Sequence, residues 1–147
     1  MNEGEGLPDV PRVVVPVTVY FFDTDAAGVV HNVAYLRMIE VARTELAKRC
    51  GWGMKEMLVG EGGCPVVART EIDYLKPARL GDELELTSEL EGMEKIRFFV
   101  KTEVRRKGES ALLCVARQTL VPVDPGNGRP KKLRADWVER WPGLRAG

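Results

Sequence analysis

One helical pattern occurs in a chain that otherwise has the alternation typical of strands, and this combination limits the folds that the sequence can adopt. Between residues 33 and 50, apolar side chains recur at helical spacing, with polar side chains on the other side. The apolar stripe consists of Tyr35, Leu36, Met38, Ile39, Ala42 and Leu46. Asn32 is a candidate N-cap, and Gly51 is a candidate stop signal. Because the apolar arc is wide, we expect other structure to enclose most of this helix.

Alternating side chains predict five strands around the helix. Residues 12–22 are predicted as a first strand that is apolar on both faces, and Pro16 within it indicates an edge position or a bulge. Residues 23–28 break this pattern as a loop. From Pro65 onward we expect an antiparallel meander of four strands, at about residues 66–76, 83–90, 95–104 and 110–121. One long helix followed by sequential strands predicts an α+β fold.

The length and composition predict one compact domain. The chain has 147 residues, of which 44% are apolar and 30% are charged. We expect a flexible arm at residues 1–11, a folded domain at residues 12–123 and a tail at residues 124–147 that packs on it. The tail contains a short basic run and two tryptophans, Trp137 and Trp141. We interpret it as a coil or short helix that packs its tryptophans, with a nucleotide or partner contact as the alternative.

Several classes of function are disfavoured by the composition. Acidic and basic residues number 22 each, so we expect no binding to nucleic acid. No apolar run approaches the roughly 18 residues that cross a bilayer, and the acidic start lacks the features of a secretory leader. We therefore expect no membrane insertion and a cytoplasmic location. Three widely spaced cysteines and the single histidine, His31, give no recognisable zinc spacing, so we expect no metal site.

Residues 20–36 read Tyr-Phe-Phe-Asp-Thr-Asp-Ala-Ala-Gly-Val-Val-His-Asn-Val-Ala-Tyr-Leu, and Glu-Val-Ala-Arg follows at residues 40–43. This stretch resembles the signature of the 4-hydroxybenzoyl-CoA thioesterase and YbgC-like family. Further similarity lies in Thr-Glu-Ile-Asp-Tyr at 70–74, Pro-Ala-Arg at 77–79 and Gly-Asp at 81–82. The resemblance spans about residues 13–123, and the ordered set is far more specific than an isolated Asp-x-Asp.

The resemblance implies a hotdog fold, in which an antiparallel sheet of about five strands wraps around one long central helix. It further implies an acyl-CoA thioesterase that needs no cofactor, with coenzyme A as part of the substrate. Family members pair their sheets edge to edge and place their active sites at the dimer interface. A homodimer, and beyond it a homotetramer, is therefore implied for this chain.

Thioester hydrolysis needs a nucleophile or an activated water, and a group that stabilises charge on the carbonyl oxygen. By similarity, Asp25 is the catalytic carboxylate, acting either as a nucleophile or as a general base. Backbone N–H groups at the helix start, near Asn32, Val33 and Ala34, lack intrahelical acceptors and would form the oxyanion hole. The alternative is that Asp25 only shapes a loop or caps a helix. For Asp23 we favour such a structural role.

The chain departs from the family pattern beside this site. Many relatives have a histidine where this chain has Asn32, which cannot transfer a proton. Asn32 either hydrogen-bonds the thioester or caps the helix, and His31 is a further candidate for substrate contact. Tyr35 and Ile39 either line the acyl pocket or belong to the core. Glu40 and Arg43 are spaced to form a structural ion pair.

Coenzyme A carries phosphates, so a neutral chain needs a local basic cluster to bind it. The outward side of the third predicted strand offers Lys95, Arg97 and Lys101, and relatives use basic residues at the start of this strand. An ordinary solvated strand face is the alternative. Further cations follow in the next turn, at Arg105, Arg106 and Lys107. Arg69 matches a position where relatives often have arginine, and it could reach the rim of the site across the dimer.

Two other functions remain compatible with this sequence. One is a hotdog dehydratase or hydratase, although the lone histidine lies in the wrong context for it. The other is a non-catalytic acyl-CoA-binding protein, which would not need Asp25. If the chain is a thioesterase, the acyl group stays open among aromatic, short aliphatic and long aliphatic chains.

Overall fold

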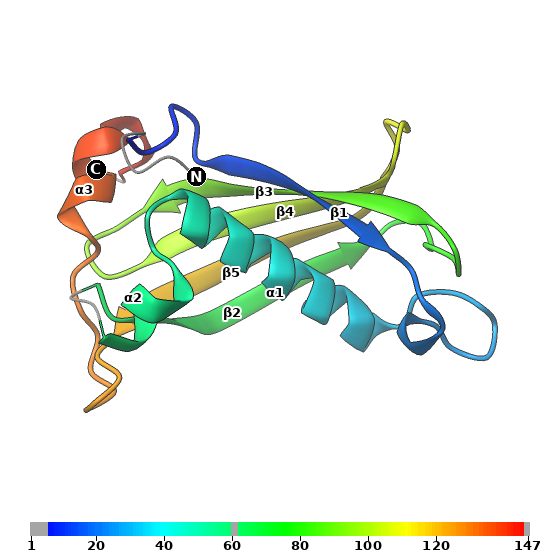
Figure 1. Cartoon of the computed structure of the whole chain (residues 1–147), viewed down its shortest axis with the longest axis horizontal. Helices are drawn as coiled ribbons and strands as arrows, with labels where there is room; N and C mark the ends of the chain where they lie inside the picture. The colour runs from blue at the N-terminus through cyan, green and yellow to red at the C-terminus, as the bar shows by residue number, and fades with distance from the viewer. Residues whose placement is uncertain (1–5, 60–61, 146–147) are drawn as a thin grey trace.

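The computed structural model describes residues 6–59 and 62–145, and part of the expected N-terminal arm, residues 1–5, lies outside this range. One long helix, α1 (Asn32–Arg49), lies against a five-stranded antiparallel sheet (Figure 1). The strands are β1 (Arg12–Thr18), β2 (Cys64–Tyr74), β3 (Glu83–Met93), β4 (Phe98–Arg106) and β5 (Leu112–Val123). Two short helices, α2 (Met54–Val59) and α3 (Ala135–Arg140), lie outside the sheet. This is the expected α+β hotdog fold.

The bounds of α1 agree with the predicted helix to within one residue at each end. Gly51 follows the helix at φ +83°, a left-handed conformation that suits glycine and ends the helix. The expectation of an enclosed helix is only half right in the single chain. One side packs on the sheet through residues such as Ile39 and Ala42, while Val33 and Leu36 are exposed. The sheet alone cannot surround the wide apolar arc.

The strand order is β1-β3-β4-β5-β2, so the predicted four-strand meander is wrong in one respect. Only β3, β4 and β5 pair in succession, whereas β2 pairs with β5 at the far edge of the sheet. The edge position that Pro16 indicated is confirmed, because β1 forms the other edge and pairs only with β3. No other described strand pairs with either edge of the sheet, and β2 is exposed along most of its length.

The first strand ends earlier than predicted. β1 stops at Thr18, and Phe21 and Phe22 lie in a 3-10 turn, η1 (Phe21–Asp23), with exposed fractions of 82% and 71%. The backbone N–H of Tyr20 donates to Asp23 Oδ2 at 3.0 Å and closes this turn. The alternation that suggested a longer strand is overridden by a local side-chain hydrogen bond.

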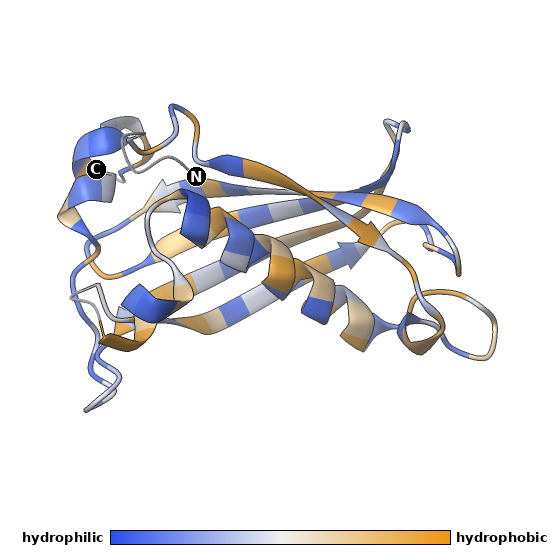
Figure 2. Ribbon diagram, viewed as in Figure 1, coloured by the Kyte–Doolittle hydropathy of each residue, from blue (hydrophilic) through white to orange (hydrophobic). Residues whose placement is uncertain are grey.

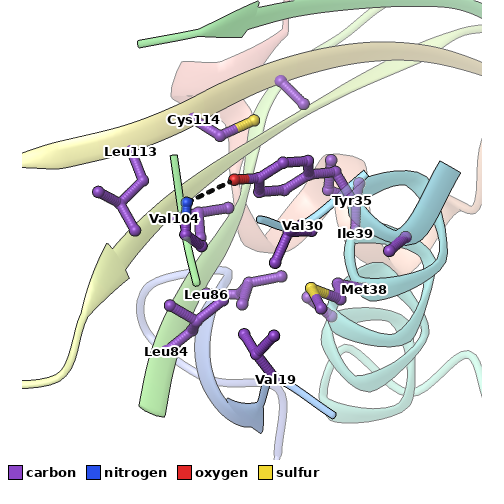
Figure 3. Packing of buried hydrophobic residues seen from close by; sticks show 14 residues of the cluster. Val19, Val30, Tyr35, Met38, Ile39, Leu84, Leu86, Val104, Leu113 and Cys114 are labelled. Carbon is purple, nitrogen blue, oxygen red and sulfur yellow. Dashed lines mark hydrogen bonds between the residues drawn. The ribbon is translucent and has the colours of Figure 1, made fainter. Parts of the chain in front are cut away.

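The core divides into two clusters along α1. The first half of the helix packs on Leu84, Leu86 and Val104 (Figure 3), at the end of the sheet where α1 begins. The second half packs on Phe98, Leu120 and Trp137, at the other end. Figure 2 shows hydrophobic and hydrophilic residues alternating along the strands, as expected for a sheet with one covered face. No helix in the described ranges is long and apolar enough to span a membrane.

The carboxyl-terminal segment covers the end of the sheet near the last turn of α1 (Figure 1). Trp137 is 3% exposed, and its indole N–H donates to the carbonyl of Cys50 at 2.8 Å. Its ring lies 5.4 Å from that of Trp52 and 5.5 Å from that of Phe98, measured between centroids. The two ends of α1 therefore have different surroundings, and only the amino-terminal end opens toward the loop that carries Asp25.

Candidate active site

Asp23 fixes the loop between β1 and α1. Its carboxylate is 1% exposed and accepts from the Tyr20 N–H at 3.0 Å and from Arg37 Nη2 at 2.9 Å. Its carbonyl accepts from the backbone N–H of His31 at 3.0 Å. A buried carboxylate needs such partners, and the contacts with Arg37 and His31 join the loop to α1 at two points. The geometry agrees with the structural role favoured for Asp23.

Asp25 lies in the exposed part of the same loop. Its Oδ1 accepts from the backbone N–H of Ala27 at 2.9 Å and from that of Val29 at 3.4 Å. Its carbonyl accepts from the N–H of Gly28 at 3.0 Å, and Gly28 adopts φ +75° to complete the turn. Within the described residues, no hydrogen bond engages Oδ2. One carboxylate oxygen thus shapes the loop, and the other has no partner among the described residues.

The residue that caps α1 is His31, so the expectation that Asn32 caps the helix is wrong. The backbone N–H of Ala34 donates to His31 Nδ1 at 3.0 Å. Because Nδ1 accepts, Nε2 carries the proton, and it donates to the carbonyl of Phe22 at 3.1 Å. Both ring nitrogens are engaged inside the chain. Asn32 is the first residue of the helix and its side chain is exposed, which leaves the other interpretation, contact with a thioester.

The His31 cap determines which backbone N–H groups at the helix start are left without an acceptor. The N–H of Ala34 is used by His31, through both Nδ1 and the carbonyl. For the N–H groups of Asn32 and Val33, no acceptor occurs in the part of the chain that the structure describes. They lie at the positive end of an 18-residue helix, where negative charge is stabilised. Of the three amides that the sequence suggested, the structure leaves these two.

A shallow pocket adjoins the helix start. It is lined by Val30, Asn32, Tyr35, Tyr74, Leu75, Lys76 and Pro77. Tyr35 is also part of the core (Figure 3), and its hydroxyl accepts from the backbone N–H of Ala78 at 3.1 Å. Burial raises the pKa of Tyr35, and the Ala78 hydrogen bond partly opposes this effect. The pocket therefore has an aromatic wall that stays uncharged at neutral pH.

Asp25 does not line this pocket. Nor does Asp25 line any of the four other best-formed cavities of the described residues. The carboxylate and the two amides are near in sequence and joined by the Asp23 contacts, yet none of these five cavities contains both of them. A closed site needs a further surface opposite the loop.

Other expected site residues have structural contacts. Arg43 Nη2 lies 3.4 Å from Glu40 Oε1, which is the predicted ion pair. Burial lowers the pKa of Arg43, and Glu40 partly offsets this change. Ile39 is fully buried in the core. Arg69 lies on the exposed edge strand β2, where its Nε contacts Glu71 Oε1 at 2.9 Å.

The predicted basic cluster lies far from Asp25 within one chain. Lys95 and Arg97 precede β4, in the turn after β3, so the expectation that they lie on a strand face is wrong. The carbonyl of Lys95 accepts from the N–H of Leu133, at the end of the sheet covered by α3. The nine residues of β4 place this turn about 30 Å from the other end. Lys101, Arg105 and Arg106 form ion pairs with Glu89, Glu103 and Asp82.

Two cations that the sequence did not single out lie beside the candidate site. Lys76 lines the pocket at the helix start, and Arg79 forms a backbone bridge with Val29. The N–H of Leu80 donates to the carbonyl of Gly28 at 3.0 Å, which holds this segment against the Asp25 loop. The sequence Pro77-Ala78-Arg79 does indicate a turn that carries a cation. It does not indicate which loop this turn contacts.

Comparison with known proteins identifies the family to which this chain belongs. The family model of the thioesterase-like superfamily matches residues 19–141. The acyl-CoA thioester hydrolase YbgC of Escherichia coli O6:H1 is 36% identical over 118 residues, which cover 80% of this chain and 87% of that protein. A 1,4-dihydroxy-2-naphthoyl-CoA hydrolase of Acaryochloris marina is 29% identical over 130 residues, covering 84% and 93%.

Solved structures agree with these matches. A thioesterase from Thermus thermophilus, complexed with coenzyme A and Zn, superposes with a TM-score of 0.74 at 32% identity, covering 94% of this chain and 97% of that one. A probable thioesterase from Bartonella henselae gives a TM-score of 0.76 at 25% identity, covering 84% and 99%. The fold, the loop before α1 and the sequence matches together place this chain in the thioesterase-like superfamily.

Proposed function

We propose that this protein hydrolyses acyl-CoA thioesters to a carboxylic acid and coenzyme A. Asp25 acts as nucleophile or general base, and the N–H groups of Asn32 and Val33 form the oxyanion hole. The observation that carries the proposal is a pair of amides at the start of α1, beside the loop that holds Asp25, for which the described residues offer no acceptor. Superfamily membership and the name of the YbgC relative support the reaction class.

The proposed reaction begins with attack on the thioester carbonyl carbon. As a nucleophile, Asp25 would form a mixed anhydride, which water then hydrolyses; as a general base, it would take a proton from an attacking water. In both routes the carbonyl oxygen gains negative charge, which the two amides stabilise, and the thiolate of coenzyme A leaves. Removing one such donor typically slows a reaction by ~100- to 1000-fold.

We further propose that a homodimer completes the site. β2 is an 11-residue edge strand whose outer backbone groups are available for pairing, and most of its residues are exposed. Antiparallel pairing of two β2 strands would place the Lys95 and Arg97 end of one chain beside the Asp25 end of the other. These cations could then meet the phosphates of coenzyme A, and Arg69, near the middle of β2, would lie at the interface.

Asp25→Asn tests the catalytic role. The amide oxygen can still accept from the Ala27 N–H, so the loop should keep its shape. We expect kcat for acyl-CoA hydrolysis to fall about 100-fold or more, with acyl-CoA binding retained. Asp124→Asn is a matched control, because Asp124 Oδ1 accepts from the Gly126 N–H at 2.7 Å in a similar turn elsewhere.

The outcomes separate the competing functions. Loss of turnover with intact binding supports the thioesterase mechanism. Turnover that stays within a few-fold of the wild type would show that the carboxylate is not the catalytic group. A protein that binds acyl-CoA but hydrolyses none of a broad substrate panel, before any substitution, would support the acyl-CoA-binding alternative.

A further inference from the structure

A mainly apolar cavity of about 200 Å³ lies beneath the second half of α1, away from Asp25, and Glu40, Arg43 and Thr44 also line it. Its walls include Leu46, Cys50, Trp52, Phe98, Leu120 and Trp137. Neither the proposed chemistry nor the proposed dimer uses this space. A cavity of about 150 Å³ with such a lining can hold a benzene molecule, so this one can hold a six-carbon unit.

A hydrogen-bonded network separates this cavity from the pocket at the helix start. Arg43 Nη1 donates to Gln118 Oε1 at 2.7 Å, and Gln118 Nε2 donates to Thr70 Oγ1 at 3.1 Å. The Arg43–Gln118–Thr70 network therefore links α1 to β5 and β2. Arg43 lines the cavity, and Gln118 is only 6% exposed. The network is a polar barrier between two mainly apolar regions.

One face of β2 runs from the pocket at the helix start to this network. Along β2, Tyr74 lines the pocket at the helix start, Ile72 packs partly against the core, and Thr70 belongs to the network. These alternate residues share one face of the strand. Leu36 lies on α1 between Asn32 and Arg43, and α1 contacts β1 and β3 more extensively than β2. α1 therefore packs less closely on β2 than on β1 and β3 along this face.

Two thiols lie in the cavity wall. Cys50 and Cys64 line it, and burial raises the pKa of Cys50 to about 12. A protonated buried thiol behaves as a small apolar group. The lining therefore suits the end of a hydrocarbon chain better than a reactive ligand.

The rise of α1 gives the distance from the helix start to the network. α1 rises about 1.5 Å per residue, so Arg43 lies about 16 Å along the axis from Asn32. An extended alkyl chain advances about 1.3 Å per carbon, because bonds of about 1.5 Å meet at about 111°. A chain whose carbonyl lies at the helix start would thus reach the network after about twelve carbons.

We propose that the Arg43–Gln118–Thr70 network determines which acyl-chain lengths the enzyme prefers. When its hydrogen bonds are formed, the network ends the space available to the acyl chain. When they are broken, the end of a longer chain enters the cavity. This inference rests on the proposed thioesterase function and adds a specificity determinant to it. Chains up to about twelve carbons fit without disturbing the network. Longer chains must break its hydrogen bonds, which lowers their kcat/KM.

Gln118→Ala tests the proposal by removing the central member of the network. The measurement is kcat/KM for saturated acyl-CoAs from four to eighteen carbons. We expect the wild type to lose activity beyond about twelve carbons, and the variant to gain about tenfold on the sixteen-carbon substrate, since each buried methylene favours binding. Short-chain kcat/KM should stay within about twofold. Thr119→Ala, on the opposite face of β5, is the matched control and should reproduce the wild-type profile.

A second variant covers the case in which Gln118→Ala does not fold, and a binding measurement tests the proposal without turnover. Thr70→Val removes one hydrogen bond of the network with little change in shape, and it answers the question if Gln118→Ala does not fold. Labelling of Cys64 by a thiol reagent, located by mass spectrometry, reports cavity occupancy without turnover. A hexadecyl-CoA thioether should protect Cys64 in the variant but not in the wild type, and an octyl-CoA thioether should protect it in neither.

An unchanged chain-length profile in a folded, active Gln118→Ala protein would overturn the proposal. So would protection of Cys64 by the hexadecyl thioether in the wild type, because the network would then be no barrier. These results differ from a failure of the catalytic proposal. That failure appears as undiminished turnover in Asp25→Asn, whatever the preferred chain length.

Discussion

Replacing His31 with alanine separates a capping role from a chemical one. As the N-cap of α1, the imidazole accepts from the Ala34 N–H at 3.0 Å through Nδ1, while Nε2 donates to the Phe22 carbonyl at 3.1 Å. His31→Ala removes both interactions. It leaves the start of α1 without a side-chain cap, and it removes one link between the helix and the Asp25 loop.

The expected loss of stability follows from these two contacts. An N-cap contributes about 1 kcal/mol, and the hydrogen bond from Nε2 to the Phe22 carbonyl contributes about 1 kcal/mol more. His31→Ala should therefore lower the free energy of unfolding by about 2 kcal/mol. For a chain of 147 residues, that change lowers Tm by about 6 °C.

Thermal unfolding followed by circular dichroism at neutral pH measures this loss. His31→Asn is the matched variant, because asparagine caps helices well but cannot reproduce the bond from Nε2. It should recover about half of the stability and keep kcat/KM within a few-fold of the wild type. An unchanged Tm in His31→Ala would refute the capping role. A loss of activity above about 100-fold in a stable His31→Asn protein would instead indicate a direct role in the chemistry.

Two further predictions concern pH and assembly. Folding raises the pKa of Cys50 to about 12, so the thiol ionises at lower pH in the unfolded chain than in the folded one. The stability that this burial contributes is fully present below pH 9 and is lost as the pH rises toward 12. Denaturant titrations at pH 8 and pH 10 should show the wild type losing about 1 kcal/mol more than Cys50→Ala, and equal losses would contradict the burial argument. Val66→Lys with Val67→Lys on the exposed edge strand β2 should convert the proposed dimer to monomers in sedimentation experiments and lower activity. A dimer that persists in this variant would place the interface elsewhere.

The helix could be predicted closely because its signals are local. The apolar spacing and the glycine at residue 51 specify α1 within a single stretch of chain. The N-cap was missed by one residue, since histidine is not among the usual capping residues and only the ring geometry of His31 reveals its role. Local patterns describe an element well and its terminal hydrogen bonds less well.

Strand pairing was harder, because it depends on contacts between distant residues. Each strand of the sheet was expected, but alternation does not state which strand lies beside which, and β2 pairs with β5 rather than with β3. Phe21 and Phe22 continued an apolar pattern, yet the buried Asp23 carboxylate closes a turn there. A carboxylate that accepts from the backbone three residues earlier outweighs the alternation.

In the candidate site, too, local features could be predicted from the sequence and long-range contacts could not. The loop position of Asp25 and the helix start follow from sequence, since both lie within a few residues of each other. The distance of Lys95 and Arg97 from that loop does not, because it depends on how the strands span the sheet. Nor does the proximity of Lys76 and Arg79, which requires knowing that Val29 and Arg79 form a bridge.

A crystal structure with a non-hydrolysable acyl-CoA analogue, in which a ketone replaces the thioester, tests the mechanism most directly. We expect the analogue's carbonyl oxygen to lie about 3 Å from the backbone nitrogens of Asn32 and Val33. We also expect an Asp25 carboxylate oxygen, or a water held by it, about 3.5 Å from the carbonyl carbon. A carbonyl bound away from the start of α1, or an Asp25 side chain facing away from it, would contradict the proposed mechanism.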